Sequence, residues 1–381
     1  MYPLKNTQQQ IKENHLRMIF KVINEKEPVS RIEVTRHTGL SATTVSSLVE
    51  ELIHRGLITE SGVKKTGTSG RRAVLLTLNP FGGCFAGVSL LAGRVSVSIY
   101  DLKFNRLFYR TTGYTSADHL ADVIVKILDE SGVQKKLLGV ALGVPGVINS
   151  EAQEVMSSTV IDMSNARMLV KTLRQALSVD NIILCNNSSL NAYAEKEFGG
   201  HGVQNIVSVD IGDGVGAGIV INGEIFGGFR GLAGELGHIT IDKHGEKCQC
   251  GGNGCLETRV SVPSVLRFAQ TMCPGVSGLD SIAAELERGN SDLMKVMDAV
   301  ARDLSFGVST VINFLDPEAV IIGGEISPLK KYLLPPLMKY AQEKMLSERK
   351  QPIIAFSTIE GDAVALGGAK YMFDKMFISQ T

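Results

Sequence analysis

Hydrophobic positions in the first forty residues recur at helical spacing. Residues 8–23 carry apolar side chains every three or four positions, which predicts an amphipathic helix. A second helix is expected at residues 30–37, because Ser30 and Glu33 have the spacing of a capping box. The next three residues, Thr-Gly-Leu, predict the turn that ends this helix.

A third helix is expected directly after that turn. Ser41 is a typical N-cap, residues 42–55 carry apolar side chains at helical spacing, and Gly56 is a typical helix end. Two helices joined by a short glycine turn predict a helix-turn-helix, whose second helix can enter the major groove of DNA. The exposed start of this helix is small and hydroxylated, which permits close approach to bases and phosphates. These candidate DNA-binding residues are Ala42, Thr43, Thr44, Ser46 and Ser47.

Two short β-type runs follow, at residues 57–59 and 73–78, with a basic segment between them. This pattern predicts the hairpin of a winged helix, and Arg71 and Arg72 at its return are further DNA-binding candidates. The alternative interpretation is a three-helix interaction domain with a solvated basic loop. Charge favours DNA: residues 1–80 hold 12 Lys and Arg against seven Glu and no Asp, although the whole chain is neutral.

From Cys84 onward the pattern changes to strands that alternate with helices. A pair of strands is expected within residues 85–100, and a helix at residues 117–130. Further buried strands are expected at 137–142, 182–185, 206–209 and 320–322, several of them followed by glycines. This alternation indicates an α/β body. Its two halves, residues 81–200 and 201–381, are each long enough for one lobe, so three domains are expected in all.

The composition excludes several classes of protein. Trp is absent and aromatic residues make up 6%, which argues against a base-stacking protein. No apolar run is long enough to span a bilayer, and the polar N-terminus is not a secretory signal, so no stable membrane insertion is expected. Six cysteines, three of them clustered, suit a reducing compartment, and a cytoplasmic protein is expected.

The clustered cysteines form the most specific motif in the chain. Together with an upstream histidine they make a Cys3His set, which is the usual donor set of a tetrahedral structural zinc site. The four candidate ligands are His238, Cys248, Cys250 and Cys255. Zinc would draw the flanking carboxylates, Glu235 and Glu257, toward one place. The zinc site would then rigidify a small-molecule pocket. In the alternative interpretation it would only stabilise the conformation of a loop.

Two weaker motifs lie nearby. Residues 212–216 read Gly-Asp-Gly-Val-Gly and could cradle a phosphate, or could form a tight β-hairpin turn. Asn186 and Asn187 follow one expected strand and precede a helix, which is where side chains of an α/β fold reach a ligand cleft.

The run A-G-E-L-G-H followed by C-x-C-G-x-x-G-C-L-E resembles the signature of the ROK family of repressors, open reading frames and sugar kinases. The resemblance covers nearly the whole chain, including G-V-P-G, G-V-G-A-G, D-P-E-A-V-I-I-G-G and A-L-G-G-A. With its N-terminal winged helix-turn-helix, the chain is similar to the repressor branch, the N-acetylglucosamine, glucose and xylose repressors. The resemblance implies an α/β fold with a two-lobed, actin-like (ribonuclease H-like) body and a sugar bound between the lobes.

The resemblance also implies roles for individual residues. Sugar hydroxyls would be bound by Glu235, His238 and Glu257, with Asn186 beside them, and zinc by His238 with the three cysteines. His238 could then bind zinc through one ring nitrogen and donate to the sugar through the other.

The chain departs from the kinase members at two places. They carry Asn-Asp where this chain has Asn186-Asn187, and an amide cannot replace that Asp as the general base. Their Asp-x-Gly-Gly-Thr phosphate loop corresponds to residues 89–93, Ser-Leu-Leu-Ala-Gly, where side chains would crowd a triphosphate. We therefore expect no phosphoryl transfer and no enzymatic activity.

These observations predict a sugar-responsive transcriptional regulator, a repressor of carbohydrate-utilisation genes such as those of xylose metabolism. A homodimer or tetramer would bind a palindromic double-stranded operator, and a sugar or sugar phosphate would shift it to a form that releases DNA. One alternative is a ROK sugar kinase with an added DNA-binding domain. Another keeps the repressor but replaces the sugar with a protein partner, such as a component of a sugar transporter.

Overall fold

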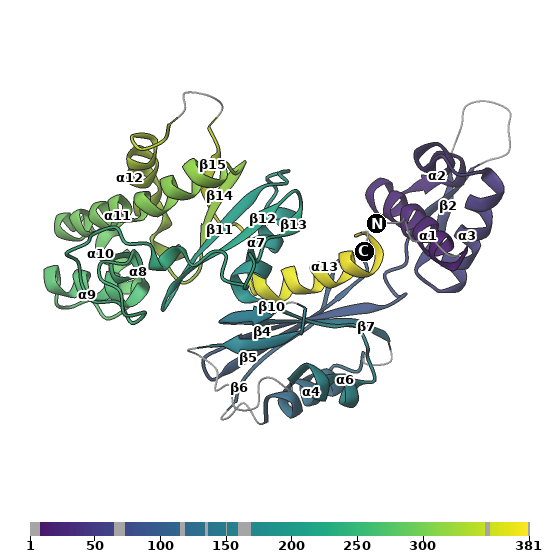
Figure 1. The fold of residues 1–381 in the computed structure, drawn as a ribbon, viewed down its shortest axis with the longest axis horizontal. Helices are drawn as coiled ribbons and strands as arrows, with labels where there is room; N and C mark the ends of the chain where they lie inside the picture. Colours follow the sequence, from purple (N-terminus) through teal and green to yellow (C-terminus); the bar gives the residue numbers. More distant parts are fainter. Residues whose placement is uncertain are drawn as a thin grey trace. The chain divides into compact units, whose positions relative to one another are not determined.

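The computed structural model describes residues 8–64, 73–114, 119–133, 136–149, 151–158, 169–346 and 351–379 (Figure 1). Contacts between residues group the chain into two compact units. Unit 1 comprises Met1–Gly143, Ile161–Leu184 and Gly368–Thr381. Unit 2 comprises Val144–Val160 and Cys185–Gly367.

Unit 1 begins with the expected winged helix-turn-helix. The three helices are α1 (Gln8–Lys26), α2 (Arg31–Thr38) and α3 (Ala42–His54). The small sheet has the order β1-β3-β2 and consists of β1 (Val29–Ser30), β2 (Ile58–Lys64) and β3 (Ala73–Leu78). The three predicted helices are confirmed. The two-residue strand β1 was not predicted, because a run that short has no periodicity to detect.

The capping residues predicted for α2 and α3 occupy the ends of these helices. Ser30 and Glu33 form the capping box of α2, and Gly39 ends that helix with a left-handed φ of 69°. The Ser41 side chain accepts a hydrogen bond from the Thr44 N–H and so caps α3. Fully buried side chains from all three helices, including Ile19, form the core beneath them.

The rest of unit 1 is an α/β layer. Its sheet has the order β10-β7-β4-β5-β6 and consists of β4 (Cys84–Leu91), β5 (Arg94–Asp101), β6 (Arg106–Gly113), β7 (Leu137–Val144) and β10 (Ile182–Asn186). β4 pairs antiparallel with β5 and parallel with β7. Helices α4 (Leu120–Glu130) and α6 (Leu169–Leu177) contact one another beside this sheet. β6 was not predicted, since most of its side chains are exposed.

Unit 2 contains a second five-stranded sheet, in the order β13-β12-β11-β14-β15. Its strands are β11 (Ile206–Ile211), β12 (Val215–Ile221), β13 (Glu224–Ile225), β14 (Ala319–Gly323) and β15 (Ile353–Phe356). β11 pairs antiparallel with β12 and parallel with β14, which repeats the arrangement of β4, β5 and β7. β8 (Val147–Asn149) and β9 (Glu154–Ser157) form a separate pair. The predicted α/β body is thus confirmed.

Helices surround this second sheet. α7 (Asn187–Phe198) contacts β11 and β12. The other helices described in unit 2 are α8 (Glu257–Val260), α9 (Val262–Met272), α10 (Leu279–Glu287), α11 (Ser291–Leu315) and α12 (Lys330–Gln342). Helix α13 (Ala363–Phe377) begins in unit 2 and continues into unit 1. Short 3-10 helices occur at Leu236–His238 and Ser327–Leu329. None of the helices in the described ranges is long and apolar enough to cross a membrane.

Candidate metal centre and adjoining carboxylates

The Cys3His residues meet at one point in unit 2. One ligand atom from each of His238, Cys248, Cys250 and Cys255 lies within 4.8 Å of all the others. His238 Nδ1 is 3.7 Å from Cys248 Sγ, and Cys250 Sγ is 3.6 Å from Cys255 Sγ. A tetrahedral zinc ion with Zn–S bonds of about 2.3 Å holds its sulfur ligands roughly 3.8 Å apart. The spacing and the soft donors therefore fit zinc.

The backbone of the cysteine loop explains how it turns so tightly. Cys248 donates its N–H to Gly252 O (2.8 Å), and Gly251 donates its N–H to Cys248 O (3.0 Å). Gly251 has a φ of 93°, a conformation that favours glycine. At Gly254 a Cβ atom would lie 1.5 Å from the Asp242 carbonyl oxygen, so no larger residue fits there. These glycines let three sulfurs face one point.

The thiols influence one another in this loop. Burial raises the pKa of Cys255 to about 12, with further contributions from the neighbouring Cys250 and Cys248 thiols. The pKa of Cys250 is lowered, first by the backbone N–H of Gly252 and then by its sulfur neighbours. A divalent cation among these sulfurs would favour the thiolate form of each, which is the form that binds metal.

The two ring nitrogens of His238 face different groups. Nδ1 faces the cysteine sulfurs, whereas Nε2 lies 3.8 Å from Glu235 Oε2. Both residues belong to or flank the 3-10 helix Leu236–His238, which places their side chains three positions apart. This arrangement leaves Nε2 and the Glu235 carboxylate available to a common ligand beside the metal centre.

Glu257 also lies beside this cluster. Its Oε1 lies 3.9 Å from Cys248 Sγ, and its Oε2 accepts the backbone N–H of Val215 (3.0 Å). At Gly214 a Cβ atom would lie 2.8 Å from Glu257 Oε2, so the glycine makes room for this carboxylate. The structure therefore brings Glu235, His238 and Glu257 around one cluster, as expected from the sequence.

Asn186 has a structural task of its own. It is the N-cap of α7, and its Oδ1 accepts the N–H groups of Ser188 (2.8 Å) and Ser189 (3.3 Å). Its Nδ2 donates to Gly146 O (2.8 Å), which engages one of the two amide protons. No described contact links Asn186 to Glu235, His238 or Glu257. The capping role follows from the strand–Asn–helix pattern, and the sequence interpretation missed it.

The glycine-rich run at residues 212–216 is a hairpin turn. Ile211 pairs with Val215 across it, and the Gly212 N–H donates to Gly214 O (2.9 Å). The N–H groups of Gly212 and Val215, which a phosphate cradle would need, thus have partners inside the protein. The hairpin interpretation of this run is confirmed.

Two further carboxylates lie at the ends of neighbouring strands and were not singled out from the sequence. Asp210 is near the end of β11 and Glu325 follows β14, which runs parallel to it. Burial, followed by the negative charge of Glu325, raises the pKa of Asp210. Glu325 also lies beside Gly212, where a Cβ atom would be 3.8 Å from its Cγ. An anionic ligand would meet negative charge at this edge.

The recognition-helix candidates are largely exposed. Ala42, Thr43, Ser46 and Ser47 are exposed and Thr44 is half-buried, while Val45 is fully buried in the core. The hydroxyls of Thr43 and Thr44 each lie 2.8 Å from Ser41 Oγ, within the N-cap of α3. Arg71 and Arg72 lie outside the described residues.

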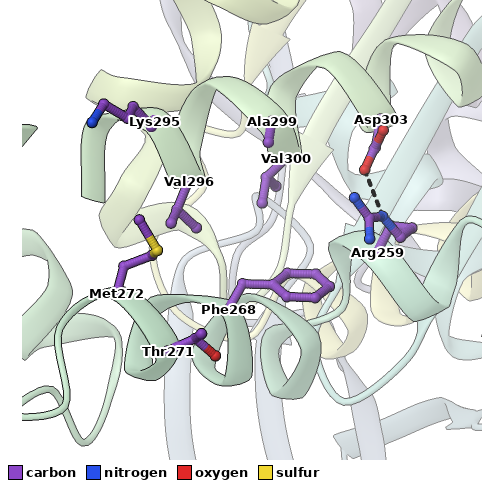
Figure 2. A pocket seen from close by; sticks show the side chains of 9 residues that line it. All are labelled: Arg259, Phe268, Thr271, Met272, Lys295, Val296, Ala299, Val300 and Asp303. Atoms are coloured by element: carbon purple, nitrogen blue, oxygen red, sulfur yellow. Dashed lines mark hydrogen bonds and ion pairs between the residues drawn. The ribbon is translucent and has the colours of Figure 1, made fainter. Parts of the chain in front are cut away.

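A cavity of about 320 Å³ lies elsewhere in unit 2, between α9 and α11 (Figure 2). Its lining is mainly apolar, with an ion pair at one end between Arg259 Nε and Asp303 Oδ2 (2.8 Å). The lining residues are Arg259, Phe268, Thr271, Met272, Lys295, Val296, Ala299, Val300 and Asp303. None of the candidate metal, sugar or DNA residues is among them.

The fold and the cysteine cluster define a class, a two-sheet α/β protein with an N-terminal winged helix and a Cys3His loop. Residues 94–376 match the model of the ROK family, and the chain belongs to this family. The resemblance stated from the sequence is thereby confirmed. The body accordingly has the actin-like fold of the family, as the resemblance implied.

Individual relatives extend the match to nearly the full length. The chain is 27% identical over 376 residues to the xylose repressor of Bacillus subtilis (strain 168), covering 96% of each chain. A ROK family transcriptional regulator, a homologue of the Escherichia coli Mlc protein, superposes with a TM-score of 0.84 at 27% identity. That match covers 96% of this chain and 97% of the regulator.

A kinase of the family matches less of the chain. The ROK hexokinase from Thermus thermophilus has a TM-score of 0.64 at 22% identity and covers 77% of this chain and 99% of its own. At this identity the similarity concerns the fold alone.

Proposed function

We propose that this chain is a sugar-responsive transcriptional repressor. Residues 1–80 would bind a palindromic operator, and residues 81–200 and 201–381 would form the two lobes of the sensing body. The observation that carries the proposal is the orientation of His238, whose Nδ1 faces the cysteine sulfurs and whose Nε2 faces Glu235, in a chain that also contains a winged helix-turn-helix. The family membership and the full-length similarity to regulators support it.

Zinc is the metal that we propose for the centre, held by His238, Cys248, Cys250 and Cys255. When bound, it would fix the imidazole ring and raise the acidity of the ring N–H that points away from the metal. Side chains of the protein would bind and orient the effector. A zinc–thiolate centre requires reduced cysteines, which supports a cytoplasmic location.

The effector would be a sugar bound through its hydroxyl groups. Glu235 and Glu257 can each accept more than one hydroxyl proton, and His238 Nε2–H can donate to a hydroxyl oxygen. Asn186 would contribute its second amide N–H from the start of α7. Since a relative is named for xylose, D-xylose is the first sugar to test.

We further propose that the chain is not a kinase. Asn187, the first residue of α7, supplies no general base. Ser89 lies in β4 and is buried, where the kinase pattern has the Asp of the phosphate loop. The negative charge of Glu325, which follows β14, lies at this edge of the sheet and would repel a triphosphate.

One experiment separates the repressor from the kinase. Purified protein is screened by thermal shift against D-xylose, other monosaccharides, disaccharides and their phosphates, and ATP consumption is measured with each. We expect at least one sugar to stabilise the protein, by roughly 2.7 kcal/mol when it is present at 100 times its dissociation constant. No sugar-dependent ATP consumption is expected, and clear turnover would refute the repressor-only proposal. If no sugar shifts the melting temperature, a protein effector becomes the leading alternative.

A further inference from the structure

Helix α13 takes part in both units. It runs without interruption from Ala363 to Phe377, as Figure 1 shows for the yellow helix. Its residues up to Gly367 group with unit 2, and those from Gly368 onward group with unit 1. The helix is continuous across Gly367 and Gly368, where the grouping changes, and a continuous secondary element is one route by which two sites can be coupled.

The first half of α13 contacts α7 at the level of the backbone. A Cβ atom on Gly367 would lie 1.9 Å from the Leu190 carbonyl oxygen and 3.0 Å from the Ala194 N atom. Leu190 lies one turn into α7, whose N-cap is Asn186. The helix that contacts α13 is therefore the one that begins at a candidate sugar-binding residue.

The second half of α13 contacts the DNA-binding part of unit 1. Phe20 of α1 packs against Phe373 and Phe377, with ring centroids 5.8 and 4.7 Å apart. Both rings of α13 also pack edge-on against Phe85 of β4, at 5.6 and 6.1 Å. Phe20, Phe85 and Phe373 are almost completely buried. This aromatic cluster joins α1, β4 and α13.

A hydrogen bond lies beside the aromatic cluster. Arg17, one turn before Phe20 on α1, donates from its guanidinium to the Ser379 carbonyl oxygen just beyond α13 (3.2 Å). The C-terminal end of the chain is thus tied to α1 by apolar and polar contacts together. α1 in turn packs against α3, which carries the candidate base-reading residues.

We propose that α13 couples the candidate sugar site to the DNA-binding domain, with Gly367 and Phe377 as its two contact points. The inference rests on the proposed function. Sugar binding at the cap of α7 changes the packing of Gly367 on that helix, and α13 carries the change to Phe20 on α1. Because such coupling is reciprocal, DNA binding must change the sugar affinity by the same factor by which sugar changes the DNA affinity, and the change should be detectable in α7.

The first test needs no sugar. Full-length protein is mixed with a duplex that it has selected from a random-sequence pool, and hydrogen exchange is measured at backbone amides 187–193 of α7. We expect the duplex to change exchange in this segment in the wild type, and the change to be lost in Phe377→Leu. Phe314→Leu serves as the control, because Phe314 on α11 is 83% exposed and should keep the response. An α7 segment unaffected by duplex in the wild type overturns the proposal.

The second test measures the coupling itself. The duplex affinity is determined with and without D-xylose, or with whichever sugar of the panel binds, and the ratio of the two affinities is the coupling factor. A factor of about 5 to 150 is typical of allosteric proteins. We expect Phe377→Leu to bring this factor close to one while the sugar affinity of DNA-free protein and the metal content are retained. A full coupling factor in Phe377→Leu refutes the inference.

A second variant tests the same coupling without changing the aromatic cluster, in case Phe377→Leu impairs folding. Gly367→Ala leaves all the phenylalanines in place and forces α13 away from Leu190, so it should lower the coupling factor by itself. Failure of the wild type to select any duplex, or to bind any sugar, contradicts the proposed function. Normal sugar and duplex binding with unchanged coupling in both variants contradicts only the role of α13.

Discussion

Glu257 accepts the backbone N–H of Val215 through one carboxylate oxygen, at 3.0 Å, while its other oxygen faces the sulfur of Cys248 at 3.9 Å. One side chain thus links the β11–β12 hairpin to the cysteine loop. A loss of order in the loop would therefore disturb the hairpin and the carboxylate that is proposed to bind sugar. This link is the reason to expect metal removal to affect ligand binding as well as stability.

The first prediction concerns the metal. Native protein purified without chelator should contain one zinc per chain, and Cys250→Ser should contain almost none, because three remaining ligands do not complete a structural site. Cys250 is exposed, so its replacement should lower the melting temperature through metal loss and not through lost packing. Elemental analysis and thermal unfolding measure both effects.

Cys273→Ser is the matched control for this change. Cys273 lies at the end of α9, away from the cluster, and should keep its zinc. Native protein without zinc would remove the metal from the proposal. Zinc retained at full stoichiometry in Cys250→Ser would show that this thiol is not a ligand.

The second prediction concerns the sugar. Glu235→Ala should abolish the thermal shift produced by the sugar, because a hydrogen bond to a charged group contributes about 1.5–3 kcal/mol. Zinc content and duplex affinity should not change, since Glu235 is not one of the four clustered ligands. Glu246→Ala is the control, as this residue lies on the same loop and pairs with Arg267. An undiminished shift in Glu235→Ala would place the effector elsewhere.

Much of the fold could be predicted from local patterns. Ser30, Glu33, Gly39 and Ser41 act within one or two turns, so the helix-turn-helix was predictable from sequence. The Cys3His cluster was also predictable, because short glycine-rich spacing brings its cysteines together. The approach of Glu235 to the cluster followed from its position three residues before His238, whereas its role in sugar binding came from the family resemblance.

Features that depend on long-range contacts could not be predicted. Glu257 meets Val215 over 42 positions, and Asp210 approaches Glu325 only because β11 and β14 run parallel. The contact of Phe20 with Phe377 joins the two ends of the chain. No periodicity encodes such pairs. The hairpin at residues 212–216 could not be chosen from sequence for the same reason, since it depends on the pairing of β11 with β12.

The third prediction concerns pH. Burial and the charge of Glu325 raise the pKa of Asp210 above its ordinary value of 3.8. The folded protein then holds this proton more tightly than the unfolded chain does, so the contribution of Asp210 to stability is present below pH 3.8 and is lost as pH rises through the raised value. Asp210→Asn should therefore increase the free energy of unfolding at pH 7 more than at pH 4.

Denaturant titrations at the two pH values check this sign. Glu325→Gln should act in the same direction but less strongly, because the charge of Glu325 is the smaller of the two causes. Asp213→Asn, in the adjoining turn, is a useful control for the removal of a nearby negative charge. A loss of stability at pH 7 in Asp210→Asn would mean that the ionised carboxylate is a favourable part of the fold.

The fourth prediction concerns DNA. With α3 in the major groove, Thr44 and Ser47 should influence which bases are preferred, and their replacement by Ala should relax specificity by about 1–3 kcal/mol at the contacted position. Arg71 and Arg72 are assigned to the wing by sequence alone. If both contact phosphate, Arg71→Ala with Arg72→Ala should weaken binding to all duplexes alike and reduce the salt dependence by roughly one charge each.

Titrations of the selected duplex and of a scrambled duplex, at several salt concentrations, distinguish these roles. Specific binding should persist at salt levels that remove the scrambled duplex, because base contacts depend less on ionic strength than phosphate contacts do. Arg36→Ala is a suitable control, since Arg36 lies in the last turn of α2, outside the proposed base-reading segment. Equal affinity for the two duplexes at every salt concentration would identify residues 1–80 as a non-specific basic domain. That result would contradict specific operator binding by the proposed repressor, even if the rest of the chain binds a sugar.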